Sequence, residues 1–376
     1  MRRRTIHWVS HLGGHSREKG VVAVLVALLL PVLVGFGALA VDISYRFLIK
    51  NELQNAADAT ALAAAPCLYG RTDCANMNAS VPDWGTAVGR GISFASANSV
   101  EQAPVSTVHI DYGYWDITKR PPSLQSLPHT PGVNDLPAVR VLINKSDNDN
   151  GGGATTFLAR IWGITSMPLS ATAVAAVSYP GSGGAGALFP IAITKCLYDN
   201  YWDVTTRQPK KATSNAPLPN TTWAQTAGRP YYFRVTSSYH AGSCESGQWS
   251  SLDIDSNNVP TIRNLIANGN SAAVSVGGQV WIQPGTKTTL YSDVDACSAA
   301  GNKSCEYVMV PVVQDISTHA RSTVIGLACL HILSATGGSG KYIEVQMSAD
   351  ADKCQAKNSS GSGPAYGMYQ PPRLVY

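Results

Sequence analysis

Residues Val21 to Val41 read VVAVLVALLLPVLVGFGALAV and contain no charged side chain. A run of about 20 apolar residues is long enough for a helix to cross the hydrocarbon core of a bilayer. Pro31, Gly35 and Gly37 interrupt the run, but membrane helices tolerate such residues. The stretch therefore predicts a transmembrane helix over residues 20–41.

The orientation of this helix follows from the residues on either side of it. Basic residues crowd the N-terminal side, and the cytoplasmic flank of a membrane helix is usually the basic one. This places residues 1–19 in the cytoplasm as a short tail and everything after residue 41 outside it. The basic residues are Arg2, Arg3, Arg4, Arg17 and Lys19.

All eight cysteines follow the apolar run, as expected for disulfides in an oxidising compartment. No C-x-x-C occurs, which argues against zinc ribbons and thioredoxin-like chemistry. The short loops CLYGRTDC and CSAAGNKSC favour local Cys67–Cys74 and Cys297–Cys305 links. The other four allow three connectivities: they are Cys196, Cys244, Cys329 and Cys354.

The helical pattern continues beyond the membrane as DISYRFLIKNELQNAADATALAAA, and Pro66 supplies a stop. Residues 42–66 therefore extend the transmembrane helix beyond the membrane. Together the two parts predict one helix of about 45 residues, roughly 65 Å long. The main rival is a signal peptide cleaved after Ala40, in the small-x-small sequence Ala38-Leu39-Ala40. An h-region is usually only about 7–15 residues long, and this argues for an uncleaved anchor.

The whole N-terminal segment resembles that of the Tad (tight-adherence, Flp-type) pilus-assembly proteins, specifically the TadG/TadE-like group. The block LQNAADATALAAA, from Leu53 to Ala65, is part of the matching signature. Residues 155–178 are similar to a segment that these proteins carry before a variable C-terminal part, and the remainder from Leu188 resembles the C-terminal region of larger Tad-like proteins. The signature residues are Gly20, Pro31, Asp42, Gln54, Asn55 and Asp58.

The resemblance implies a non-catalytic, minor pilin-like or membrane-anchored assembly component of a Tad/Flp pilus. Its expected partners are the inner membrane and other Tad pilus proteins, which would contact the N-terminal helix, with the small residues Ala56 to Ala65 allowing close helix approach. Processed pilins are similar in having a Glu five residues after the cleavage-site Gly, where this chain has Leu25. Cleavage after Gly20 therefore stays open. The D-x-S-x-S metal site of some relatives is missing, since the sequences at Asp42 and Asp315 lack its second serine.

The exported part reads as an α+β fold in two units. Alternating strands within a first unit, residues 67–180, predict a small pilin-like α+β domain whose sheet packs on a helix. The Gly/Ser/Ala-rich residues 181–187 predict a flexible linker. Residues 188–376 predict a mostly β domain, a sandwich or barrel, with one helix near residues 261–269. The Gly/Ser/Pro-rich tail after Cys354 is expected to be loosely ordered.

No motif with catalytic spacing is present, neither G-x-S-x-G nor H-E-x-x-H, and no cofactor or metal is predicted. The tract Asp147 to Gly151 favours a turn over a calcium loop.

The net charge is only +4, with much of the basic excess in the tail, so nucleic acid is not an expected partner. Aromatic clusters at 112–115 and 198–202 fit either sheet packing or a binding surface. Two alternatives to a pilus component stay open. One is an adhesin that binds carbohydrate or protein through the β-rich domain, and the other is a membrane-anchored exported hydrolase.

Overall fold

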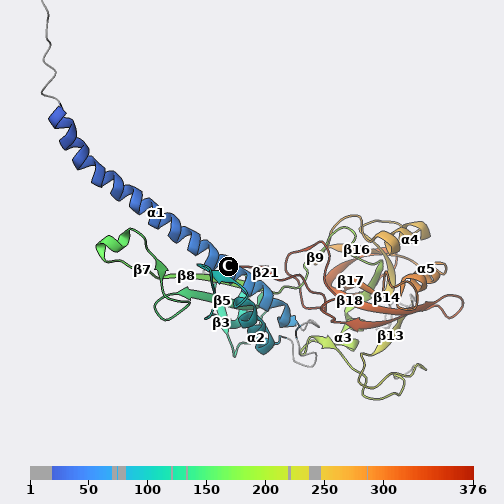
Figure 1. The fold of residues 1–376 in the computed structure, drawn as a ribbon. Helices are drawn as coiled ribbons and strands as arrows, with labels where there is room; N and C mark the ends of the chain where they lie inside the picture. The colour runs from blue at the N-terminus through green and yellow to red at the C-terminus, as the bar shows by residue number, and fades with distance from the viewer. Residues whose placement is uncertain are drawn as a thin grey trace, which may run out of the picture.

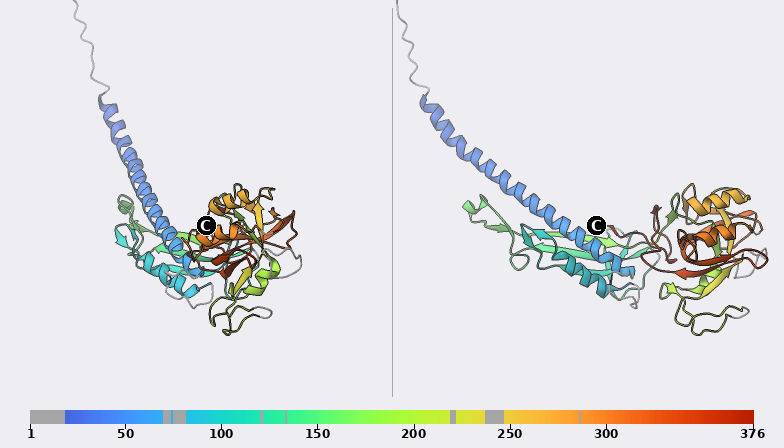
Figure 2. Two further views of the ribbon diagram at one scale, coloured as in Figure 1. Left: turned by 90° about the vertical axis from the view of Figure 1, so that its right-hand side faces the viewer. Right: turned by 45° about the vertical axis from the view of Figure 1, so that its right-hand side comes forward.

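The computed structural model describes residues 19–69, 74, 82–119, 122–132, 134–218, 222–236, 247–285 and 287–376. One long helix, α1 (Lys19–Ala64), leads into two packed units, a small α+β domain and a β-rich domain (Figure 1). The predicted α+β fold with a long N-terminal helix is confirmed. In all views the N-terminal half of α1 projects away from both units (Figure 2).

The two halves of α1 have different surroundings. Large apolar side chains between Val22 and Val41 are exposed, and this part of the helix is long and apolar enough to cross a membrane. In the second half, Ile49, Leu53 and Ala57 are buried at a spacing of four residues, which places them on one face of the helix. Full burial of an Ile or Leu side chain contributes about 1.5–3 kcal/mol. The α-helix ends at Ala64, two residues before Pro66, and continues as the short 3₁₀ helix η1 (Ala65–Tyr69).

The α+β domain is built on a five-stranded antiparallel sheet in the order β21-β8-β5-β3-β4. The second half of α1 and helix α2 (Trp84–Ala95) pack on this domain's core. Side chains alternate between two clusters along β5, as strand geometry requires. The strands are β3 (His109–Asp116), β4 (Leu124–Ser126), β5 (Asp135–Lys145), β8 (Leu169–Ala176) and β21 (Arg373–Leu374).

The small residues of α1 serve the packing of this domain. Ala57, Ala61 and Ala64 are fully buried in its core. At Gly91 of α2 an added Cβ would lie 2.6 Å from Ile110 Cδ1 and 3.3 Å from Ala64 Cβ, so a larger residue there would require the Ile110 side chain to shift. The expectation that the alanine block contacts other pilus helices is therefore wrong for these buried positions, because the chain's own α2 and sheet occupy them.

The β-rich domain is a closed barrel. Its sheet has the order β13-β19-β18-β16-β14-β10-β17, and an additional β17–β18 pairing closes a ring of the last five strands. Strands β19 and β13 extend the sheet from β18. Closure is possible because β18 (Ala320–Thr336), 17 residues long, pairs first with β16, then with β17 and then with β19. The other strands are β10 (Ile191–Thr194), β13 (Tyr232–Val235), β14 (Gly247–Leu252), β16 (Gln279–Ile282), β17 (Tyr307–Val313) and β19 (Tyr342–Ser348).

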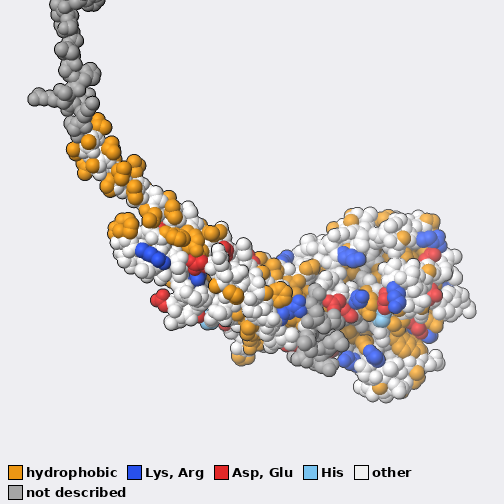
Figure 3. Space-filling model, viewed as in Figure 1, with side chains coloured by type: hydrophobic (Ala, Val, Ile, Leu, Met, Phe, Trp, Pro, Cys, Tyr) orange, Lys and Arg blue, Asp and Glu red, His pale blue; other side chains and the backbone are white. Residues whose placement is uncertain are grey.

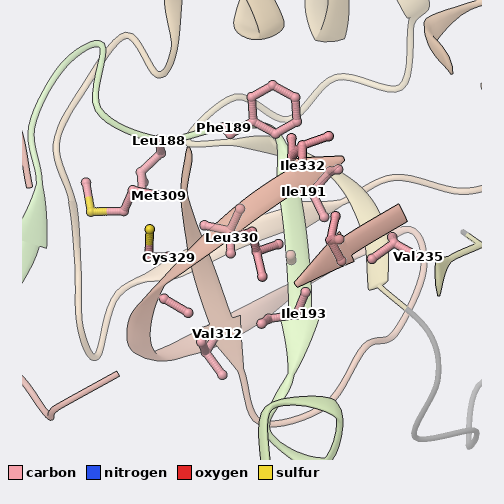
Figure 4. Close-up of a cluster of buried hydrophobic side chains, with 14 of the residues drawn as sticks. Leu188, Phe189, Ile191, Ile193, Val235, Met309, Val312, Cys329, Leu330 and Ile332 are labelled. Carbon is pink, nitrogen blue, oxygen red and sulfur yellow. The ribbon is translucent and has the colours of Figure 1, made fainter. Parts of the chain in front are cut away.

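Branched aliphatic side chains fill the barrel. Figure 4 shows Ile191 and Ile193 of β10 gathered with Val312, Leu330 and Ile332 of the neighbouring strands. The helix predicted near 261–269 is α4, and the described residues of this domain also contain α3 and α5, which the sequence pattern did not predict. Their bounds are α3 (Lys195–Tyr201), α4 (Val259–Asn268) and α5 (Leu290–Cys297).

Residues 181–187 do not form a flexible linker. Ser182 and Gly183 form β9, which pairs with β15 (Val274–Ser275) on one side and β20 (Ser359–Ser360) on the other. An added Cβ at Gly183 would lie 2.9 Å from Leu188 Cγ. The small residues that indicate flexibility in the sequence are required here for close packing.

The C-terminal tail is also ordered, contrary to the sequence expectation. After Cys354 the chain returns to the first domain, where β21 pairs with β8 and Tyr369 is buried in the α+β core. Ser178 Oγ donates to Gln370 Oε1 at 2.7 Å, in a fully buried contact. Two chain segments thus join the domains, and the tail contributes a strand to a sheet formed mainly by residues 109–176.

Disulfides join Cys67 to Cys74 and Cys297 to Cys305, the two pairs favoured by the short loops. A third joins Cys329 of β18 to Cys354, at the start of the tail. Cys196 is also disulfide-bonded, and Cys244 lies outside the described residues.

Candidate membrane-exit site

The carboxylate of Asp42 lies where α1 leaves its apolar run, and it binds a loop from the far end of the α+β domain. We call residues 154–167 the finger; they comprise β6 (Ala154–Thr155), η2 (Ala159–Trp162) and β7 (Ser166–Met167). Asp42 Oδ1 accepts from Phe157 N at 2.7 Å, and Oδ2 accepts from Leu158 N at 3.1 Å and Ala159 N at 2.7 Å.

These bonds give Asp42 the role of an N-cap supplied from another element. The first N–H groups of any helical turn have no partner within the turn, and a carboxylate satisfies them well. The N–H of Phe157 is the main cause that lowers the pKa of Asp42 from its ordinary value of 3.8, aided by those of Ala159 and Leu158 against partial desolvation. Asp42 is therefore ionised at neutral pH and fastens the finger to α1.

A second group of contacts holds the base of the finger. The ring of Tyr45 packs edge-on against Phe157, with centroids 4.8 Å apart, and its hydroxyl donates to Glu101 Oε1 at 2.9 Å. Thr155 Oγ1 donates to the same oxygen at 2.7 Å. The buried Lys145 ammonium lies 2.9 Å from Glu101 Oε2. Burial opposes ionisation of Glu101, but the bonds from Thr155, Lys145 and Tyr45 outweigh it, so the pKa of Glu101 is lowered.

Two further polar residues attach α1 to the edge of β8. Gln54 Nε2 donates to the Thr172 carbonyl at 3.1 Å and to Asp58 Oδ1 at 2.8 Å. One turn earlier, Lys50 Nζ donates to the Ser170 carbonyl. Strand β21 pairs with β8 only at Ala175 and Ala176, so it does not pair with Ser170 or Thr172. Side chains of α1 therefore bind strand carbonyls at alternate positions along this part of β8.

The six signature residues have different surroundings. Asp42 contacts the finger, Gln54 donates to a carbonyl of β8, and Asp58 accepts from Gln54. Pro31 and Asn55 lie on the exposed surface of α1, and Gly20 is in its first turn. The site also uses Tyr45, Glu101 and Lys145, which sequence reasoning missed because they come from three separate segments of the chain.

The other candidate sites turn out to be packing features. Within the described ranges there is no group of three His, Cys, Asp or Glu side chains able to hold a metal. In the Asp147 to Gly151 tract, Asn150 accepts from Ser106 N at 2.8 Å and donates to Asn144 O at 2.6 Å, so it fastens a turn. Tyr198 and Trp202 are buried and stacked on each other, which favours the sheet-packing interpretation of that aromatic cluster.

Two known protein families match parts of α1 and of the α+β domain. A family described as Flp pilus-assembly TadE/G-like matches residues 20–66, and one described as Tad-like Flp pilus-assembly matches residues 50–175. Residues 20–175 are therefore similar to Tad/Flp pilus-assembly proteins. The first Tad match ends at Pro66, where α1 gives way to η1. No curated protein and no solved structure gives a match.

The second match covers most of the α+β domain rather than the residues from Leu188 onward, and both matches end before the barrel. It includes the finger, Glu101 and Lys145, whereas Asp42 and Tyr45 lie in the part of α1 that only the first match covers. The two Tad matches overlap in the second half of α1. Asp42, the finger and the residues that contact them therefore all lie within residues 20–175, which the two matches cover together.

Proposed function

We propose that this chain is a non-catalytic component of a Tad/Flp pilus, anchored in the inner membrane by the first half of α1. The observation that carries the proposal is the division of α1. Its apolar half is exposed, whereas its second half is an integral part of the core of a domain matched to Tad pilus-assembly families. An exposed apolar helix continuous with a folded head is suited to the membrane and to assembly with other helices.

In this proposal residues 1–19 are cytoplasmic and both folded domains are periplasmic or surface-exposed. Basic residues before the apolar run support that orientation through the positive-inside rule. The disulfides of both domains support it independently, because such bonds persist in oxidising compartments.

Contacts with other pilus proteins would use the outward face of α1 beyond the membrane. Phe47 and Leu48 are large, exposed apolar residues there, whereas the alanines that follow are buried within the chain's own domain. Such side chains are disfavoured in water and suit a protein partner. The assembly surface is therefore predicted at Phe47 and Leu48.

Deletion and complementation test this function. Cells lacking the chain should assemble fewer Tad pili, counted by electron microscopy, and the full chain should restore them. A double variant, Leu29→Arg with Leu33→Arg, should fail, because each buried charge costs about 2.5–3.5 kcal/mol at the centre of a membrane helix. The control Val204→Asn, at an exposed position of the second domain, should complement fully.

A photo-crosslinking residue at position 47 tests the partner. Its main adducts should be Tad pilus proteins. Normal piliation of the deletion strain, or adducts only with proteins unrelated to the pilus, would contradict the proposal.

A further inference from the structure

The finger presents an apolar surface that the fold of its own domain leaves uncovered. Ile161 is 75% exposed, Trp162 68%, Phe157 54% and Ile164 44%. Single exposed apolar residues are ordinary, but a contiguous cluster of this size marks a contact surface. In Figure 3 hydrophobic side chains gather on this segment beside those of α1.

The position of the finger along α1 indicates what covers this surface. A groove between the two is lined by Val32, Phe36 and Leu39 of α1 and by Trp162 and Ile164 of the finger. Val32 precedes Asp42 by ten residues, which corresponds to about 15 Å along a helix. The finger thus lies beside the second half of the apolar run, on the N-terminal side of Asp42.

We infer that the finger is a second membrane contact of this protein, inserted into the leaflet from which α1 emerges. The inference rests on the proposed anchoring of α1. If residues 20–41 cross the bilayer, Asp42 holds the finger at a level where lipid surrounds it. Trp is enriched at the membrane interface, and shallow burial of an apolar face in that region is the binding mode of interfacial helices.

The backbone of the finger is suited to a medium with little water. Unpaired N–H and C=O groups are costly in lipid. The amides of residues 157–159 bind Asp42, Thr156 N binds the Thr165 carbonyl at 3.2 Å, and Gly163 N binds the Arg160 carbonyl at 3.0 Å. These five N–H groups are therefore bonded within the finger or to α1, while its large apolar side chains are exposed.

Charged residues around the finger fit lipid headgroups. Arg160 lies in η2, between the apolar residues, and its long side chain can extend toward the headgroup region. On the domain side of Asp42, Arg46 and Lys50 line a second groove with Pro168. Basic groups next to an apolar cluster match an anionic phospholipid surface.

Insertion of the finger has a mechanical consequence. A single helix leaves the attached domain free to rotate about the membrane normal and to tilt. A second contact, joined to α1 through Asp42 and Tyr45, fixes the orientation of the α+β domain relative to the bilayer. The exposed face of α1 at Phe47 is then presented in one direction along the membrane.

Lipid photo-crosslinking in the full-length chain, in envelope membranes containing labelled phospholipid, tests the inference. A photoreactive amino acid is placed at Ile161, at Phe36 in the apolar run, or at Val204; these positions are 75%, 68% and 69% exposed. Lipid adducts are expected at 161 and 36, with at least a five-fold lower yield at 204.

The other outcomes distinguish failure of the finger's membrane contact from failure of the anchor. A yield at 161 as low as at 204, with normal labelling at 36, would overturn the membrane contact and leave the anchor intact. Adducts at 161 with protein alone would show that a pilus subunit covers the finger. Absence of lipid adducts at 36 would remove the anchor and the inference together.

A second measurement does not depend on crosslinking yield. A fluorescent amino acid at position 161 should be quenched several-fold more than one at 204 by phospholipid with a nitroxide on the upper acyl chain. Equal quenching at the two positions would contradict insertion.

Discussion

Tyr69, the last residue of η1, stacks on Tyr369 of the C-terminal tail, with ring centroids 4.7 Å apart. Both side chains are buried in the core of the α+β domain. Tyr179, where the chain leaves that domain, packs on the same Tyr369 ring at 5.8 Å. The end of the long helix, the passage between the domains and the tail therefore meet at one residue.

Replacing Tyr369 should destabilise the α+β domain strongly. Tyr369→Ala removes a buried aromatic ring, and truncations of this kind cost about 3–5 kcal/mol. Pulse proteolysis of the detergent-solubilised full chain would measure the free energy of unfolding. Tyr376→Ala, at an exposed side chain of the same tail, is the matched control. Equal losses in the two variants would show that the Tyr369 stack has no special role.

Asp42→Asn should release the finger while the rest of the domain stays folded. The amide keeps the shape but removes the negative charge that the three N–H groups bind. Hydrogen exchange at residues 157–159 should accelerate at neutral pH. Asp116→Asn, at a turn of the same domain, should leave finger exchange unchanged. Unaltered exchange in Asp42→Asn would show that the finger is held mainly by Tyr45 and Glu101.

Acidification should release the finger in the unaltered protein. The folded-state pKa of Asp42 is below its ordinary value of 3.8. The stabilisation from its ionised form is therefore fully present above that value and is lost as pH falls through the lower folded-state pKa. Exchange at 157–159, corrected for the intrinsic rate, should rise below about pH 4. In Asp42→Asn the contribution of Asp42 to this step should be missing, and only the contribution of Glu101, whose pKa is also lowered, should remain.

Non-reducing peptide mapping of envelope protein should recover the Cys67–Cys74, Cys297–Cys305 and Cys329–Cys354 links, together with a Cys196–Cys244 link. Free thiols at these positions would remove the argument for an oxidising compartment. Replacing Cys329 and Cys354 by Ser opens a loop with a sequence separation of 25. By the chain-entropy relation this should cost about 3–4 kcal/mol.

Reporter fusions test the topology. A reporter enzyme active only in the periplasm should be active when fused after residue 66 and inactive when fused at residue 15. The positive-inside rule is the physical reason. The reverse pattern would contradict the orientation, whatever the role of the finger.

N-terminal mass spectrometry separates three states of the anchor. We expect the uncleaved form, because the apolar run is long enough to span a bilayer and Leu25 stands where processed pilins have Glu. A start at Val21 in sheared pili would show prepilin-type cleavage despite Leu25. A start at Val41, with the protein soluble after carbonate extraction, would overturn the anchor.

Local patterns in the sequence were sufficient for several elements. The helix from Lys19 to Ala64 follows from continuous helix-favouring residues and a proline stop, both of which act over a few neighbours. Alternating residues predicted β3 and β5, and the Asn-Gly ending predicted α4. Helix α5 was missed because its polar residues, Ser292, Asp293 and Asp295, weaken the apolar pattern. Strand β14 was missed because its sequence, GQWSSL, does not alternate apolar and polar residues, although every residue in it is buried.

The sequence by itself determined the long helix, its apolar first half, the α+β composition and the similarity to Tad proteins, because each depends on residue types at short spacing. Only the tertiary structure decided the barrel closure at β18, the return of the tail to β8 and the use of the alanine block inside the domain. It also decided the contact between Asp42 and a loop more than a hundred residues away. Such contacts depend on which segments meet after folding, and an exposed apolar finger has the same local sequence as a buried one.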